Sequence, residues 1–373
     1  MGSPKKLQEF TPIVTTPYTN IVDPSFKACM HGISNQFKKI FNAHSVVILP
    51  GSGTFAMEAV ARQFATNKRA LVVVNGYFGY RWHEILTQGS ITSKITLLRG
   101  IPTSGEGTTS YRPPLEDTVI ETMKRDGTEI LLLSHIDTST GIMLPPSYIK
   151  TLAAAAHSQG AFVVLDCIAS GCVWADMKEY GLDAIITAPQ KAFYAPAATG
   201  IVCLSERARS MMGTEEGSTS FSLDLAKWAN VMEQYESGNF AYHTTLPTTA
   251  IEQFGRSLSE LEAFGFPQLE KAQMTLGQLV RTALVKRGYK SVAAPGFEGP
   301  TVLVFHCADS TAMVQLFKQE GFKIAGGFSF FLGEKEKPKT FRLGLFGLDK
   351  LRDVHGTARN LDAVLQNGGR ARL

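Results

Sequence analysis

Two ionisable side chains in this sequence each follow a short apolar run. Lys191 comes at the end of the run at residues 182–190, and Asp166 directly follows the run at residues 161–165. Such runs predict strands, so both side chains would stand at the edge of a sheet, where an amine is partly desolvated. A lysine that forms a Schiff base and an aspartate that pairs with a pyridinium nitrogen are the two groups that pyridoxal 5'-phosphate (PLP) requires. Alone, a surface lysine and a strand-terminal aspartate are the commoner explanation, so the interpretation depends on the accompanying motifs.

A glycine-rich turn, Gly51-Ser52-Gly53-Thr54, separates a predicted strand from a predicted helix. Its glycines let the backbone approach an anion, and the free N–H groups at the start of the helix carry a partial positive charge. The hydroxyls of Ser52 and Thr54 add two donors. The turn is therefore a candidate phosphate site, although an ordinary glycine turn followed by a threonine cap would have the same sequence. It is not a Walker loop, because no Gly-Lys-Ser/Thr follows.

Two further loops follow predicted strands and carry residues that suit a flat ligand. In the loop at residues 75–82, Phe78 lies between glycines and could stack on a pyridine ring, although an aromatic residue beside a turn is more often a packing residue. The loop at residues 135–141 carries several hydroxyl groups, among them that of Thr138. Its alternative explanation is an Asp/Ser/Thr turn closed by glycine.

The composition is that of a globular enzyme. The 373 residues include 37 basic and 33 acidic side chains, a net charge of +4 that does not suggest nucleic acid as a partner. The apolar runs are too short for a membrane helix, and the five scattered cysteines suggest neither a zinc site nor a disulfide framework. We expect a cytoplasmic protein. The C-terminal residues 371–373, Ala-Arg-Leu, resemble a peroxisomal address, which would apply if the source is eukaryotic.

The order of the predicted elements positions these loops. Strands and helices alternate through the first two-thirds, which predicts a mostly parallel sheet between helices, with ligands bound beyond the carboxyl ends of the strands. In the helix at residues 54–64, Phe55 is expected on the buried face and Gln63 in water. We predict an α/β fold with a large domain at residues 1–250 and a smaller α+β domain at residues 251–373.

Taken together, these motifs resemble class V aminotransferases of PLP fold type I. The similarity covers roughly residues 45 to 365. The motifs that carry it, in order, are Gly51-Ser52-Gly53-Thr54, Gly79-Tyr80-Arg81, the segment at 135–141, Asp166-Cys167-Ile168-Ala169-Ser170, Gln190-Lys191, the segment at 242–247 and the segment at 341–347. Within the family, the sequence most resembles alanine–glyoxylate (serine–pyruvate) and 2-aminoethylphosphonate–pyruvate aminotransferases.

The resemblance implies a role for each matching residue. Lys191 and Asp166 would be catalytic, and Arg342 would bind the substrate carboxylate. The cofactor-binding residues would be Ser52, Gly53, Thr54, Phe78, Thr138, Asp166, Ile168, Gln190, Lys191, Tyr242 and Thr245. Of these, Ser52, Gly53, Thr54 and Gln190 would hold the phosphate. Tyr242 and Thr245 would reach the phosphate bound by the neighbouring subunit, which implies a homodimer with shared active sites.

The leading interpretation is a transaminase that moves an amino group from a small, alanine-like donor to glyoxylate or pyruvate. The segment at residues 222–230 favours the alanine–glyoxylate branch, and the 2-aminoethylphosphonate–pyruvate branch stays open. A PLP-dependent lyase or desulfurase would need a nucleophilic cysteine on an exposed loop. A non-catalytic PLP-fold protein would be expected to lack Lys191 or Asp166. The N-terminal segment, with Thr15-Thr16-Pro17-Tyr18, departs from the Gly-Pro-Gly-Pro-like segment of the family, and this leaves the substrate open.

Overall fold

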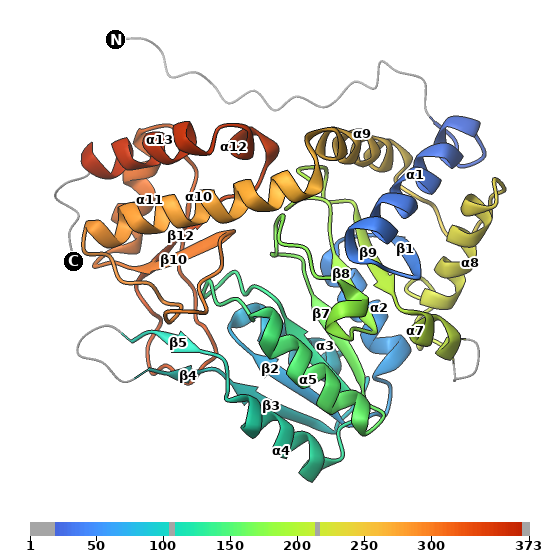
Figure 1. The fold of residues 1–373 in the computed structure, drawn as a ribbon. Helices are drawn as coiled ribbons and strands as arrows, with labels where there is room; N and C mark the ends of the chain where they lie inside the picture. Colours follow the sequence, from blue (N-terminus) through green and yellow to red (C-terminus); the bar gives the residue numbers. More distant parts are fainter. Residues whose placement is uncertain (1–18, 104–108, 213–216, 368–373) are drawn as a thin grey trace.

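The computed structural model describes residues 19–103, 109–212 and 217–367. A seven-stranded sheet lies at its centre (Figure 1). In spatial order its strands are β1 (Ser45–Pro50), β9 (Thr199–Leu204), β8 (Ala184–Thr187), β7 (Phe162–Asp166), β6 (Ile130–Ser134), β2 (Ala70–Val74) and β3 (Ile95–Arg99). The strands β3, β2, β6, β7 and β8 are parallel, whereas β9 is antiparallel to both of its neighbours. Because β1 is antiparallel to β9, it runs in the same direction as the other five, and the prediction of a mostly parallel sheet is confirmed.

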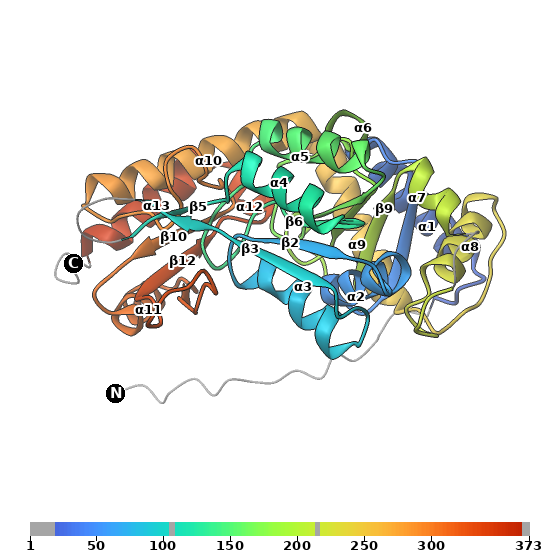
Figure 2. The same cartoon turned by 90° about the horizontal axis from the view of Figure 1, so that it is seen from below.

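Helices cover both faces of this sheet, as Figure 2 shows. On one face lie α2 (Gly53–Phe64) and α3 (Tyr77–Gln88), and on the other α4 (Glu116–Asp126), α5 (Pro146–Ser158) and the short α6 (Met177–Tyr180). The β1 edge is covered by α1 (Pro24–Phe41) and α8 (Leu225–Glu236), while α7 (Glu206–Met211) follows β9. Five strands, β2, β6, β7, β8 and β9, are buried along their whole length, which is expected where helices cover both faces.

One expectation for helix α2 was wrong. Phe55 is 50% exposed, and Gln63, which we expected in water, is 4% exposed. The physical reason is that α2 packs against β8 and β9 and also touches α3 and α8, so side chains on more than one face of the helix are covered. A simple two-faced pattern does not describe a helix with neighbours on three sides.

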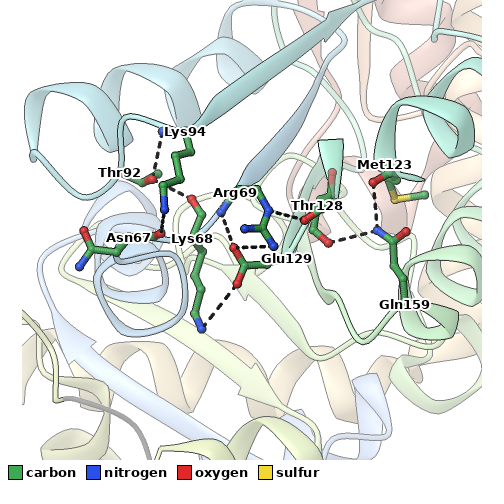
Figure 3. Close-up of polar contacts among 10 residues, drawn as sticks. Asn67, Lys68, Arg69, Thr92, Lys94, Met123, Thr128, Glu129 and Gln159 are labelled. Carbon is green, nitrogen blue, oxygen red and sulfur yellow. Dashed lines mark hydrogen bonds and ion pairs between the residues drawn. The ribbon is translucent and has the colours of Figure 1, made fainter. Parts of the chain in front are cut away.

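Polar contacts connect residues that precede the amino ends of four neighbouring strands, β3, β2, β6 and β7 (Figure 3). The carboxylate of Glu129, just before β6, accepts a hydrogen bond of 2.9 Å from the backbone N–H of Arg69 and lies 3.4 Å from its guanidinium. Thr92, before β3, donates to the carbonyl of Lys68 at 2.7 Å, and Gln159 donates to the carbonyl of Thr128 at 3.1 Å. These contacts involve residues next to the strands' amino ends, so they leave the carboxyl edge to other loops.

The C-terminal part contains a second sheet (Figure 1). Its strands, in the order β10 (Val302–His306), β12 (Thr340–Gly344) and β11 (Ala325–Gly326), are antiparallel. Around them are α10 (Phe266–Lys286), α11 (Ser310–Gln319), α12 (Leu348–Arg352) and α13 (Val354–Asn367), and a two-stranded ribbon, β4 (Ile101–Pro102) and β5 (Tyr111–Arg112), lies nearby. Helix α9 (Thr248–Phe264) begins before residue 250 and packs against α1, so the domain boundary at that residue stays a prediction. Within the described residues, no helix has the length and apolar character needed to cross a membrane.

Candidate active site

A cavity of about 220 Å³ lies beyond the carboxyl ends of the parallel strands. It is lined by Ser52, Gly53, Thr54, Met57, Phe78, Arg81, Ile136, Thr138, Asp166, Ile168, Ala169, Gln190 and Lys191. Nine of the predicted cofactor-binding residues are in this set. Tyr242, Thr245 and Arg342 are not. Loops far apart in the sequence meet here because six strands of the sheet run in one direction, so their carboxyl ends share an edge.

The turn between β1 and α2 has the geometry of an anion cradle. Gly51 has a φ of +120°, a conformation that residues with a side chain rarely adopt. A Cβ atom on Gly53 would lie 2.5 Å from the Ile168 side chain, so a larger residue there would require Ile168 to shift. Ser52 precedes the helix without capping it through its side chain, which leaves N–H groups of the first turn open to a ligand. Arg81 donates to the hydroxyl of Thr54 at 3.3 Å and adds a full positive charge.

Asp166 ends strand β7 and is buried. Its Oδ1 accepts a hydrogen bond of 2.8 Å from the backbone N–H of Ile168. The pKa of Asp166 is raised to about 7, chiefly by burial; the Ile168 hydrogen bond and the charge of Arg81 oppose the rise, and the carboxylate of Asp137 contributes to it. Within the described part of the chain, no basic side chain forms an ion pair with Asp166. The site thus contains a buried carboxylate that a cationic ligand group would stabilise.

Lys191 lies in the connection between β8 and β9, where a parallel strand is followed by an antiparallel one. Its side chain is partly buried, and burial lowers the pKa of the amine, with a further contribution from the positive charge of Arg342. The Nζ atom lies 5.3 Å from the centre of the Phe346 ring. Burial and the charge of Arg342 favour the neutral amine, which is the nucleophilic form, whereas the nearby Phe346 ring favours the charged form. Next to it, Oε1 of Gln190 is buried and has no hydrogen-bond partner.

Asp137 is the site residue that the sequence did not predict. It lies in the loop at residues 135–141, in which the sequence predicted Thr138 and not Asp137 as a site residue. Its buried carboxylate accepts hydrogen bonds of 2.9 Å from the backbone N–H of Gly79 and 2.8 Å from that of Ser139. The N-cap residue of α3, Gly76, has no side chain to cap the helix, so Asp137 takes this place from another loop. A Cβ atom on Gly76 would lie 2.3 Å from Asp137 Oδ1.

This arrangement fixes Phe78 in the first turn of α3, at the wall of the cavity. Arg81, one turn further along, lies with its guanidinium carbon 4.7 Å from the centre of the Phe78 ring. Sequence analysis included Arg81 in a family motif and assigned it no role. The signal for Asp137 was the Asp-x-Ser pattern at 137–139 together with a glycine at the helix start, but only the fold brings the two together.

Arg342 lies on β12 in the second sheet, outside the cavity lining. Its Nε donates to the carbonyl of Gly326 at 3.0 Å, and its guanidinium carbon lies 4.0 Å from the centre of the Phe328 ring. Burial lowers the pKa of Arg342, while the negative charge of Asp137 opposes this. The positive charge of Arg342 contributes to the lowered pKa of Lys191, so the two side chains are close enough to interact electrostatically.

Tyr242 and Thr245 are exposed, and Tyr242 is 65% exposed. Between them, His243 is held by a hydrogen-bond contact of 2.8 Å between its ring Nε2 and the carbonyl of Phe221, and its ring lies 5.1 Å from that of Trp228. The segment is therefore attached to helix α8 and presents Tyr242 outward. The role of both residues toward a second subunit stays a prediction.

Comparison with known proteins identifies the class of this chain. The model of the family "Aminotransferase class-V" matches residues 22–345, and the chain belongs to this family. The chain is 26% identical over 355 residues to alanine–glyoxylate aminotransferase 1 of Saccharomyces cerevisiae, covering 89% of this chain and 87% of that protein. It is 25% identical to 2-aminoethylphosphonate–pyruvate transaminase of Pseudomonas fluorescens, covering 87% and 84%.

A similar fold is found in the crystal structure of ureidoglycine–glyoxylate aminotransferase from Bacillus subtilis. The TM-score is 0.78 at 20% identity, covering 96% of this chain and 90% of that one. The chain is a PLP-dependent transaminase. The cavity fits this cofactor, since it combines a glycine cradle with a buried, unpaired carboxylate on Asp166 and a partly desolvated lysine.

Proposed function

We propose that this transaminase takes the amino group of a small, alanine-like amino acid and transfers it to glyoxylate or pyruvate. The observation that carries the proposal is the single cavity in which an anion cradle, Asp166 and Lys191 meet, with Arg342 beside it. The relatives named for alanine and glyoxylate, and for 2-aminoethylphosphonate and pyruvate, support small substrates. The guanidinium of Arg342, which interacts electrostatically with Lys191, suits one carboxylate group of a substrate, while Arg81 lies at the phosphate cradle.

Each residue then has a defined task. When bound, PLP supplies an electron sink for the bond-breaking at the substrate α-carbon. Asp166 holds a proton at the pyridine nitrogen through its negative charge. Lys191, with an amine kept partly neutral by burial, removes and returns the proton at the substrate α-carbon. Arg342 binds the carboxylate through its planar guanidinium and thereby fixes which bond of the α-carbon is aligned for cleavage.

The remaining residues hold the cofactor. Ser52, Gly53, Thr54 and Gln190 bind the phosphate, and Arg81 adds charge to the same cradle. Phe78 and Ile168 would contact the faces of the cofactor ring, and Thr138 its edge. Except for that of Arg81, these assignments are the ones that the resemblance to class V aminotransferases implies, and the presence of all these residues in the lining of one cavity supports them.

The lyase or desulfurase alternative requires a reactive thiolate. Cys167 and Cys172 are buried, burial raises the pKa of Cys167 above its ordinary range, and it raises that of Cys172 to about 12. Cys29, Cys203 and Cys307 also have raised pKa values through burial. A thiol in such surroundings stays protonated near neutral pH, so these cysteines do not favour thiol chemistry.

We also propose a homodimer in which Tyr242 and Thr245 complete the phosphate site of the partner. Their exposed positions outside the cavity of their own subunit support this arrangement. A mixture of Lys191→Ala and Tyr242→Ala chains, unfolded and refolded together, should regain activity, because one of the two sites in a mixed dimer would carry neither change. Absence of recovery in a mixture that forms dimers would contradict the sharing of active sites between subunits.

A cytoplasmic localisation is likewise a proposal. The tripeptide at 371–373 and the segment at 15–18 lie outside the described residues.

The visible spectrum of the purified, PLP-loaded protein tests the function. L-alanine should convert the cofactor band to that of the amino form, and glyoxylate or pyruvate should restore it. Conversion by 2-aminoethylphosphonate and not by alanine would favour the phosphonate branch, and no conversion by either would reject the proposed substrates. Lys191→Ala is the control: after borohydride treatment it should carry no covalently attached cofactor, whereas the unchanged protein should.

A further inference from the structure

The segment between β11 and β12 contains a loop, residues 327–334, that contacts the candidate substrate arginine. Phe328 lies under the guanidinium of Arg342, with 4.0 Å between the guanidinium carbon and the ring centre. Gly326, at the end of β11, accepts the hydrogen bond from Arg342 Nε at 3.0 Å. The neighbouring Gly327 donates to the carbonyl of Thr340 at 2.7 Å. The start of this 327–334 loop therefore fixes both the plane and the direction of the Arg342 side chain.

The same loop reaches across to the large sheet and its helices. The Phe331 ring stacks on Tyr80 of α3 with 4.4 Å between ring centres and 10° between ring planes. The carbonyl of Phe331 accepts a hydrogen bond of 2.9 Å from Arg99 at the end of β3. Phe328 contacts Tyr77 in the first turn of α3, at 5.4 Å between ring centres. The loop thus connects Arg342 to the helix whose first turn carries Phe78.

One carboxylate holds this loop in shape. Glu334 accepts hydrogen bonds from three successive backbone N–H groups, those of Phe330, of Phe331 at 2.9 Å and of Leu332 at 2.8 Å. Phe331 has a φ of +61°, which is costly for a bulky residue unless its surroundings hold it there. Three charge-assisted hydrogen bonds from consecutive residues offset this cost. Without them, the Phe331 end of the loop would lose the bonds that keep its backbone in the left-handed region.

We propose that Glu334 is a positioning residue for substrate binding: through the 327–334 loop it keeps Phe328 under Arg342 and so keeps the guanidinium oriented toward the carboxylate of the substrate. This inference rests on the proposed role of Arg342. Glu334 itself does not line the cavity with Lys191. Replacing Glu334 should therefore weaken the binding of the substrate carboxylate. It should leave the phosphate cradle, Asp166 and Lys191 unchanged.

The test compares Glu334→Gln with Glu336→Gln, which removes the same charge two residues away at an exposed position. In Glu334→Gln, an amide replaces a carboxylate that accepts three N–H groups. We expect KM for L-alanine and the dissociation constant of unreactive propionate to rise by about tenfold, the size of one lost charge-assisted hydrogen bond. We expect the PLP dissociation constant and kcat to change less than twofold. Glu336→Gln should match the unchanged protein in all four quantities.

Arg342→Ala, measured in parallel, separates this inference from the proposed function. If Arg342→Ala weakens propionate and Glu334→Gln does not, the positioning role of Glu334 is wrong and the role of Arg342 stands. If Arg342→Ala leaves the KM for L-alanine and the dissociation constant of propionate unchanged, the proposed role of Arg342 is wrong. The inference about Glu334 is then wrong as well. A fall in kcat and in PLP affinity for Glu334→Gln, together with a lower melting temperature, would show a general structural role and overturn the proposal. A fourth variant, Phe328→Leu, keeps the loop bonds and should reproduce the loss of carboxylate affinity alone.

Discussion

Replacing Asp166 by asparagine should stabilise the cofactor-free protein while it destroys cofactor binding. The carboxylate is buried without a cationic partner among the described residues, so the apoprotein is destabilised when this group is ionised. Asparagine has the same shape, carries no charge, and its Oδ1 atom can still accept the hydrogen bond from Ile168. Adding PLP should reverse the order of stability, because the pyridine N–H⁺ pairs with the aspartate and not with the amide.

The magnitude follows from the pKa of Asp166. Burial raises this pKa from 3.8 to about 7. Below about pH 4 the carboxyl is protonated in the folded and in the unfolded chain, so it does not lower the free energy of unfolding. Between the two values the folded chain holds a proton that the unfolded chain releases, so stability falls as pH rises, and above about pH 7 the full cost is reached. At ~1.4 kcal/mol for each tenfold change, the cost is roughly 4 kcal/mol, or roughly 5 °C in melting temperature for a chain of this size.

Melting temperatures of the two apoproteins across this pH range provide the assay. The asparagine variant should melt higher at about pH 8, and its advantage should be less than half as large at about pH 5. The matched control is Asp183→Asn. Asp183 is also buried at a strand end but accepts hydrogen bonds from Arg207 at 2.9 Å and from the Val163 N–H at 2.8 Å, so its replacement should lower the melting temperature. Equal melting temperatures of wild type and Asp166→Asn at both pH values would refute the reasoning.

Four further variants test the geometry. Gly76→Ala places a Cβ atom 2.3 Å from the Asp137 carboxylate, so we expect the free energy of unfolding to fall by about 2 kcal/mol. The dissociation constant of PLP, measured by fluorescence titration, should rise. Arg81→Gln should weaken PLP binding by about tenfold, while kcat at saturating PLP changes little, and an unchanged dissociation constant would remove this charge from the phosphate site. Gly277→Ala in α10 should destabilise, because its Cβ atom would lie 2.5 Å from backbone, whereas Gly32→Ala in α1, with no atom within 4 Å, should stabilise by about 0.5–1 kcal/mol in urea unfolding.

The sequence predicted the site best where it depends on strand ends. Asp166 and Lys191 could be assigned because apolar runs end at or just before them, and parallel strands bring such ends to one edge. The antiparallel direction of β9 could not be predicted as readily from the sequence. Alternation of strands and helices predicts parallel pairing, but only eleven residues separate β8 from β9, too few for a crossover helix, so β9 runs back beside β8.

Contacts between distant loops could not be predicted in this way. Asp137 lies sixty-one residues after Gly76, and nothing local in the sequence states that its carboxylate caps the helix that Gly76 begins. The same holds for Glu334, whose pattern is that of an ordinary charged loop until its three N–H partners are seen. Phe55 and Gln63 were misassigned because the number of neighbours around a helix is a tertiary property that its own periodicity does not contain.

The pairing of β1 with β9 also bears on how this protein is made. Ser45 lies opposite Leu204 in the sheet, so the ribosome synthesises β9 on the order of 10 s after β1. Until then, the Gly51 N–H lacks the Ala198 carbonyl to which it donates at 2.9 Å, and the turn between β1 and α2 does not have β9 beside it. A nascent chain that ends before β9 therefore offers PLP no complete site. The complete site for the cofactor requires β9 to be paired with β1 in the large sheet.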